Sequence, residues 1–215
     1  MLATWQLCAC SRLLRMLVDV EPKPQFYLAH TYSFHALHFY STLAENTCNP
    51  SWTLLYILRK GISVRLGQLK IAAQFIGAFL ATLLFSGVWV AEISGSPSQT
   101  EDCSGRIQTT ISKAFLAELV VSAMVQLSVM HTQSRDFRVR VNALAATVTA
   151  LAYAGGHLTG AIFNPALAFS LHLSCFLEKF WNYTLVYWVA PCIGSVLVAI
   201  LWDDVIPPIR SYFNV

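Results

Sequence analysis

Long apolar segments separated by short polar connections are the dominant pattern along the chain. A segment of roughly 17 to 25 apolar residues is long enough to cross the hydrocarbon core of a bilayer, which is about 30 Å thick. The pattern predicts four such spans, at residues 71–91, 114–130, 139–154 and 183–202. A weaker fifth, at residues 25–44, is aromatic and carries His30, His35 and His38.

The opening stretch has a different pattern. Residues 1–10 are apolar, and Arg12 and Arg15 follow them. About ten residues are too few for a crossing, so we expect this stretch to be the tail of a helix and the first span to be truncated. A cleaved signal peptide is the alternative. However, a signal peptide carries its positive charge before the apolar run, whereas here the charge comes after it.

Charge placement predicts how the spans are oriented. Four basic residues lie between positions 59 and 70 and three between 135 and 140, whereas the connection at 92–108 holds three acidic residues and one arginine. Cytoplasmic connections carry the excess of lysine and arginine. The two basic connections are therefore expected to face the cytosol, and the acidic connection to face the lumen or the exterior.

The composition agrees with a membrane protein. Of the 215 residues, 56% are hydrophobic and 12% are charged, with a mean hydropathy of +0.55, whereas a soluble domain has roughly 25% charged residues. The net charge of +3 follows from the basic connections, so we expect the lipid bilayer as a partner and no nucleic acid. The six cysteines form no CxxC pair. We expect them to pack as small apolar residues, with no metal site and no cofactor.

An internal repeat divides the chain into two related halves. The string KIAAQFIGAFL at 70–80 matches YWVAPCIGSVL at 187–197, which pairs Gly77 with Gly194, and the two Asn-Pro pairs of the chain recur at nearly the same offset. We place repeat one at residues 1–92, a luminal or extracellular connection at 93–109 and repeat two at 110–215. An odd number of spans in each half inverts one half relative to the other.

Each repeat also contains a short segment that begins with Asn-Pro and continues for about ten helix-compatible residues. Asparagine is a favoured N-cap and proline a favoured first helical residue, so both segments are predicted to be half-helices within the membrane. Their N-termini meet near the midplane, where helix dipoles of about +0.5 charge repel cations and asparagine amides hold the oxygen of a small neutral solute. The predicted fold is therefore an all-α, multi-pass membrane domain, an inverted repeat of three spans and one half-helix each.

Several strings in the chain resemble one known family. FNPA preceded by TG, the first Asn-Pro pair, a glutamate within the span at 114–130, and the paired AQFIG and APCIG strings resemble the aquaporin, or major intrinsic protein, family across nearly the whole chain. The string YAGGHLTGAIFNPALAFSLH at 153–172 resembles its unorthodox branch, of the aquaporin-11 and aquaporin-12 type. The resemblance implies a homotetramer with one pore per subunit, passive conduction of water and small neutral solutes, and no enzymatic activity. It also favours intracellular membranes, the endoplasmic reticulum in particular, over the plasma membrane.

The resemblance also assigns roles to individual residues. The pore midplane would be formed by Asn49, Pro50 and Ser51 of the first box and Asn164, Pro165 and Ala166 of the second. Serine in place of the alanine of the first box is typical of the unorthodox branch. Structural support is assigned to Glu118, Gly77 and Gly194, with Glu118 as a brace for the loop ahead of the second box.

The outer constriction departs from the family pattern. Orthodox members have an arginine directly after the second box, where this chain has Leu167, and the neighbouring constriction positions are Ala161 and Ala152. An apolar constriction is expected to favour amphipathic solutes such as glycerol or hydrogen peroxide over fast water flow.

Two other functional classes are kept as alternatives. The partner of Glu118 in the first repeat would lie before Met1, so a chain with a truncated first span could be a non-conducting membrane scaffold of the endoplasmic reticulum. A membrane-embedded di-iron enzyme would use histidines such as His30, His35 and His38, but it also needs several carboxylates within the spans, which are nearly absent. Aromatic or interfacial packing is therefore the favoured role of these histidines.

Overall fold

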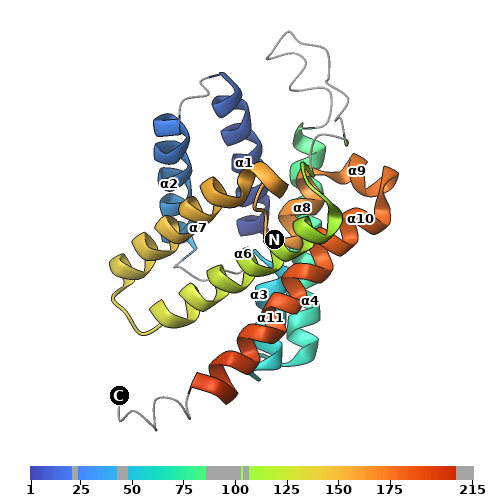
Figure 1. Cartoon of the computed structure of the whole chain (residues 1–215). Coiled ribbons are helices and arrows are strands. Elements are labelled where there is room, and N and C mark those ends of the chain that lie inside the picture. Colours follow the sequence, from blue (N-terminus) through green and yellow to red (C-terminus); the bar gives the residue numbers. More distant parts are fainter. Residues whose placement is uncertain (21–23, 43–47, 86–102, 104–106, 207–215) are drawn as a thin grey trace.

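The described part of the chain is helical. The computed structural model describes the 215-residue chain except residues 21–23, 43–47, 86–102, 104–106 and 207–215. The helices of the first half are α1 (Leu2–Val20), α2 (Pro24–Ser41), α3 (Pro50–Leu58) and α4 (Val64–Phe85) (Figure 1). Those of the second half are α6 (Ile111–Thr132), α7 (Phe137–Thr159), α8 (Pro165–Leu171), α9 (Leu173–Glu178), α10 (Phe180–Thr184) and α11 (Ala190–Ile200). Two π-helical turns, η1 (Leu185–Val189) and η2 (Leu201–Val205), flank α11.

Three described helices are long and apolar enough to cross a membrane. They comprise Val64–Leu84, Ile111–Thr132 and the continuous stretch Phe180–Val205. The span predicted at 71–91 therefore begins earlier, because its helix already starts at Val64 beside the basic connection. Residues 86–91 of that prediction lie outside the described residues.

The expectation for the opening stretch was wrong in its length. Leu2–Val20 forms a single helix of 19 residues, and neither Arg12 nor Arg15 ends it. Both arginines are half-buried, and the guanidinium of Arg12 donates a hydrogen bond to the carbonyl oxygen of Ser170 in α8. The helix continues because these charges face protein rather than lipid.

Helices at equivalent places in the two halves pack in the same way. α1 packs on α4 as α6 packs on α11, and α8 contacts α4 as α3 contacts α11. α2 and α7 pack against each other across the two halves. Gly77 and Gly194 permit the first pair of contacts, because a side chain on Gly77 would collide with the main chain of Met1, and one on Gly194 would lie 3.1 Å from the carbonyl oxygen of Leu119.

The two half-helices are short. α3 has nine residues and α8 has seven, so the second is shorter than the predicted ten. At His172 the backbone leaves helical geometry (φ −133°, ψ 32°), and α9 begins at the next residue. The buried His172 ring stacks on Tyr187, with ring centroids 5.6 Å apart. This ring stacking fixes His172 at the point where the helix breaks between α8 and α9.

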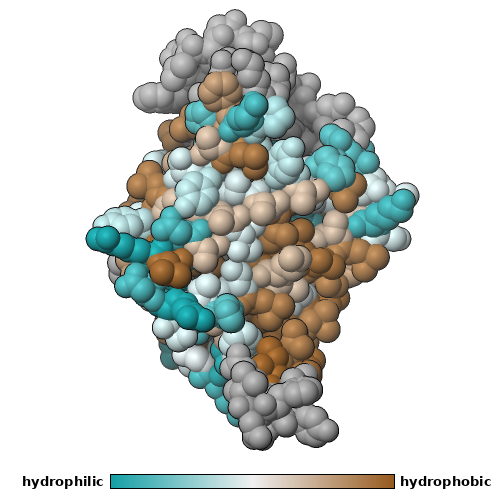
Figure 2. Space-filling view, turned by 60° about the vertical axis from the view of Figure 1, so that its left-hand side comes forward, coloured by the Kyte–Doolittle hydropathy of each residue, from teal (hydrophilic) through white to brown (hydrophobic). Residues whose placement is uncertain are grey.

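The outer surface suits a lipid environment. Figure 2 shows a broad hydrophobic area on one face. Large exposed apolar side chains are frequent on α4 and α11, and they include Leu69, Ile76, Phe79, Leu83, Val196, Leu197 and Ile200. The interior instead holds a cluster between α2, α3, α6 and α7 that includes Phe39, Trp52, Val125, Leu144 and Val148.

One disulfide bond and one ion pair lie toward opposite ends of the molecule (Figure 1). Cys103 forms a disulfide bond with Cys175 of α9, which corrects the expectation that all six cysteines pack as small apolar residues. Disulfide bonds persist in oxidising compartments, and Cys103 lies in the connection that the charge pattern assigns to the lumen or exterior. At the other end, Arg59 pairs with Asp203, with 2.8 Å between nitrogen and oxygen.

Candidate functional site

The two asparagines of the Asn-Pro boxes form reciprocal hydrogen bonds. The side-chain amide of Asn49 donates to the carbonyl oxygen of Phe163 at 3.0 Å. The amide of Asn164 donates to the carbonyl oxygen of Cys48 at 3.1 Å. Each asparagine thus binds the residue that directly precedes the other one. The tips of α3 and α8 are joined by this exchange.

The same asparagines cap their own half-helices. Asn49 Oδ1 accepts from the main-chain nitrogen of Ser51 at 3.0 Å, and Asn164 Oδ1 accepts from the nitrogen of Ala166 at 3.0 Å. Pro50 and Pro165 occupy the first helical positions, where a missing N–H costs nothing. The Asn-Pro sequence therefore starts each helix and orients an amide toward the opposite helix.

Ser51 adds a contact that alanine would lack. Its hydroxyl donates to Asn49 Oδ1 at 2.8 Å. Its main-chain carbonyl oxygen, which alanine would also have, accepts from the hydroxyl of Ser195 in α11 at 2.6 Å. Ser51 is fully buried. The departure in the first box therefore adds a bond to the cap and leaves the asparagine in place.

A buried carboxylate holds the loop between α7 and α8. Glu118 of α6 is 0% exposed. It accepts hydrogen bonds from the hydroxyl of Thr159 at 2.6 Å and from the main-chain nitrogens of Ile162 at 3.0 Å and Phe163 at 2.6 Å. Gly160, Ala161 and Phe163 have positive φ angles of 84°, 46° and 41°. This conformation is unfavourable for residues other than glycine, so the carboxylate stabilises a strained entry into α8.

Both asparagines line a narrow cavity at the meeting point of the half-helices. Its volume is about 30 Å³, enough for about one or two water molecules. Asn49 and Asn164 are 2% and 3% exposed. Apolar side chains from both repeats complete the walls, together with His35, His38 and Cys48.

Two further cavities lead from this point toward the end that carries the disulfide. A middle cavity of about 100 Å³ shares His35, Val148, Phe163 and Leu167 with the narrow cavity. A mouth cavity of about 370 Å³ shares Arg15, Tyr27, Ala152 and Gly160 with the middle cavity. The three cavities therefore adjoin in sequence from the mouth to the asparagine pair.

The residues assigned to the constriction by resemblance come together in the structure. Ala152, Ala161 and Leu167 all line the middle cavity. Sequence reasoning missed the contribution of the first two helices, from which Arg15, Tyr27, Thr31 and His35 also line this cavity. Two arginines in an otherwise apolar opening segment were the available signal, because a charge within a membrane helix is functional by default.

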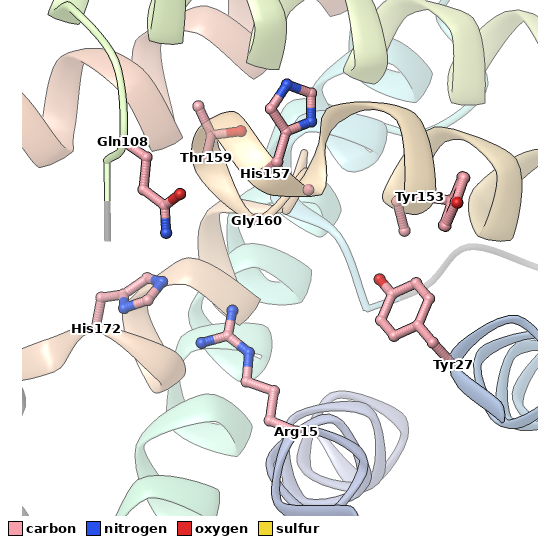
Figure 3. A pocket seen from close by; sticks show the side chains of 10 residues that line it. Arg15, Tyr27, Gln108, Tyr153, His157, Thr159, Gly160 and His172 are labelled. Carbon is pink, nitrogen blue, oxygen red and sulfur yellow. The ribbon is translucent and has the colours of Figure 1, made fainter. Parts of the chain in front are cut away.

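The mouth cavity is more polar than the middle one. Figure 3 shows Arg15 reaching from α1 and Tyr27 from α2 toward the space below Gly160, with His172 on the opposite side. Gln108 and Thr159 also line this cavity. These polar side chains surround the entrance, whereas the narrower region beyond it is mostly apolar.

His30 lies apart from His35 and His38, which both line the narrow cavity. His30 is exposed and hydrogen bonds within its own helix, while His38 Nε2 lies 3.3 Å from the sulfur of Cys48. Within the part of the chain that the structure describes, no group of three or more histidine, cysteine, aspartate or glutamate side chains could hold a metal ion. The arrangement supplies hydrogen-bond donors along a narrow path.

Comparison with known proteins gives a consistent result. Residues 27–202 match the family model described as major intrinsic protein. The chain is 35% identical to aquaporin-11 of Rattus norvegicus over 209 residues, which cover 96% of this chain and 77% of that protein. It is 31% identical to aquaporin-12 of Mus musculus over 211 residues, with coverage of 94% and 72%.

A solved structure has the same fold. The X-ray structure of the aquaglyceroporin from Plasmodium falciparum superposes on this chain with a TM-score of 0.68 at 18% sequence identity. The superposition covers 87% of this chain and 83% of the aquaglyceroporin chain. The likeness confirms the predicted all-α, multi-span membrane fold.

Proposed function

This chain belongs to the major intrinsic protein family, the aquaporin channels, and on that premise we propose that it conducts water and small neutral solutes through the adjoining cavities. The family is one of channels and not of enzymes, so the membrane-enzyme alternative is discarded. The observation that carries the proposal is that Asn49 and Asn164 line the narrow cavity together. Each amide has two N–H donors and uses one for the opposite half-helix, which leaves the other for a solute oxygen.

The constriction supports small amphipathic solutes. Ala152, Ala161 and Leu167 line the middle cavity and offer no side-chain hydrogen-bond donor. In such a constriction a solute with a carbon skeleton loses less on leaving bulk water than a water molecule does, because part of its surface is apolar. Glycerol is therefore a proposed solute beside water, and hydrogen peroxide is proposed as a second one because it is small and neutral.

The experiment is stopped-flow light scattering on proteoliposomes, with an osmotic step in sucrose and then in glycerol. Asn164→Asp tests the pore, because the new carboxylate oxygen would face the carbonyl oxygen of Cys48, which now accepts the amide. Asn182→Asp, an exposed position in α10, is the matched control. Permeability above that of empty liposomes, lowered by Asn164→Asp and not by Asn182→Asp, is the expected result.

The narrowness of the midplane cavity favours a second candidate function. A volume of about 30 Å³ leaves little space for a solute larger than water, as expected of a non-conducting scaffold that retains the fold. Proteoliposomes with folded wild-type protein and the permeability of empty liposomes to both solutes would select the scaffold and reject the channel.

We also propose that the protein lies in the membrane of the endoplasmic reticulum and assembles as a homotetramer. The disulfide between Cys103 and Cys175 requires an oxidising side of the membrane, as the lumen of the endoplasmic reticulum provides. The family resemblance supports a homotetramer. Native mass spectrometry of the detergent-solubilised protein tests the assembly, and co-localisation with a marker of the endoplasmic reticulum tests the compartment.

A further inference from the structure

A positive charge from the first helix lies at the entrance to the pore. Arg15 lines both the mouth cavity and the middle cavity, and Figure 3 shows its side chain extending from α1 into the mouth. A Cβ atom on Gly160 would lie 3.5 Å from a terminal nitrogen of the Arg15 guanidinium. The guanidinium therefore lies beside the loop that enters the second half-helix.

Arg15 is the only lysine, arginine, aspartate or glutamate among the described residues that line the three cavities. Leu167, directly after the second box, lines the middle cavity without a charge or a donor. Among these described lining residues, the charged side chain therefore belongs to α1 and not to α8.

Contacts of α1 fix the place of this charge. Arg12, one helical turn before Arg15, donates to the carbonyl oxygen of Ser170 near the end of α8. The hydroxyl of Thr82 in α4 donates to the same carbonyl oxygen at 3.1 Å. α1 and α8 are thus tied together at one point, which holds Arg15 against the passage that α8 lines. A charged side chain within a membrane helix is costly, so two arginines on one face indicate a function.

We propose that Arg15 is a specificity-determining residue of the channel, the fixed cation of its mouth. Its charge repels cations from the passage, and its bulk narrows the entrance. This role rests on the proposed channel function, and it assigns to the first helix a task that the second box does not perform.

The test compares wild type with Arg15→Gln, which keeps most of the length and polarity but removes the charge, and with Arg15→Lys, which keeps the charge. Arg138→Gln, an exposed arginine at the start of α7, is the matched control. Each variant is checked for folding by size-exclusion chromatography. Water and glycerol permeability are then measured by stopped flow, and potassium conductance in planar bilayers.

We expect Arg15→Gln to raise potassium conductance by about tenfold, equivalent to about 1.4 kcal/mol, and to raise the ratio of glycerol to water permeability. Arg15→Lys is expected to keep potassium out, and Arg138→Gln to match wild type. Folded Arg15→Gln with the conductance and the permeability ratio of wild type would overturn the role of Arg15. A wild type that conducts neither water nor glycerol would instead reject the channel function itself. If Arg15→Gln fails to fold, a potassium conductance of Arg15→Lys similar to that of empty bilayers supports the proposal, and one well above it overturns it.

Discussion

The main-chain nitrogen of Phe163 donates a 2.6 Å hydrogen bond to a carboxylate oxygen of Glu118. The carbonyl oxygen of the same Phe163 accepts the amide of Asn49 at 3.0 Å. One residue therefore connects a buried carboxylate in α6 to the tip of the half-helix α3. Because Phe163 has a positive φ of 41°, its geometry depends on these two bonds. The position of Asn49 is consequently coupled to Glu118.

Replacement of Glu118 by glutamine should destabilise the protein. A carboxylate accepts at both oxygens, but a glutamine amide presents one oxygen and one NH2 group, so one of the loop donors loses its acceptor. An unsatisfied buried donor costs about 1 to 3 kcal/mol. The expected result is a lower thermal midpoint of Glu118→Gln in detergent, together with lower water permeability in proteoliposomes.

The matched control for this change is Glu178→Gln in α9, whose side chain is 61% exposed. It should leave both measurements unchanged. A Glu118→Gln variant with the wild-type midpoint and permeability would show that the loop keeps its strained conformation without the carboxylate.

Ser51→Ala should affect stability and spare conduction. The change removes the 2.8 Å hydrogen bond from the serine hydroxyl to Asn49 Oδ1, but the main-chain nitrogen of residue 51 still caps the helix. A net loss of about 1 kcal/mol is expected for one such bond. Thermal unfolding should detect this loss, with Ser134→Ala at an exposed site as the control. Water permeability reduced to the level of Asn164→Asp would contradict the view that Ser51 acts on the cap alone.

Cys175→Ser should lower stability through the loss of the disulfide with Cys103, which closes a separation of 72 residues. Removal of a native cross-link of this kind costs about 2 to 4 kcal/mol. The expected result is a lower thermal midpoint, matched by wild type under reducing conditions. Cys192→Ser, at a free cysteine, should behave like wild type. A reducing agent that leaves the wild-type midpoint unchanged would show that the cross-link does not contribute to stability.

Much of the fold could be predicted from local signals. Asn49 and Asn164 begin half-helices because the chemistry of capping is local, and the structure places both N-caps where the sequence predicts them. Gly77 and Gly194 could be paired by the internal repeat, and both lie at close contacts of helices. Such features depend on a few neighbouring residues, so a single sequence carries them.

Other features depend on contacts between distant residues. Arg12 and Arg15 follow the opening apolar run and predict that the span ends there, but α8 and its loop, about 145 residues after Arg15, provide a protein environment for the charge. The bond between Cys103 and Cys175 likewise joins segments that no local pattern connects. Even α8 is shorter than its helix-compatible sequence, because His172 packs on Tyr187 in another helix. These outcomes are decided by tertiary packing.

An arginine introduced at position 167 of α8 should repel Arg15 of α1. Leu167 and Arg15 line the same middle cavity of about 100 Å³, so Leu167→Arg brings two like charges into a small space. Like charges at about 4 Å repel by several kcal/mol at an effective dielectric constant of about 20. Leu167→Arg alone is therefore expected to lower the thermal midpoint and the glycerol permeability.

The double variant Arg15→Gln with Leu167→Arg separates charge from position. If the mouth needs one fixed cation, the arginine at 167 should restore the potassium exclusion that Arg15→Gln loses, and the thermal midpoint should exceed that of Leu167→Arg alone. Leu167→Met is the control for a change of side chain without charge. Additive effects of the two substitutions on the midpoint would mean that the two side chains do not interact. A double variant that still conducts potassium would mean that only the position on α1 places the charge where a cation must pass.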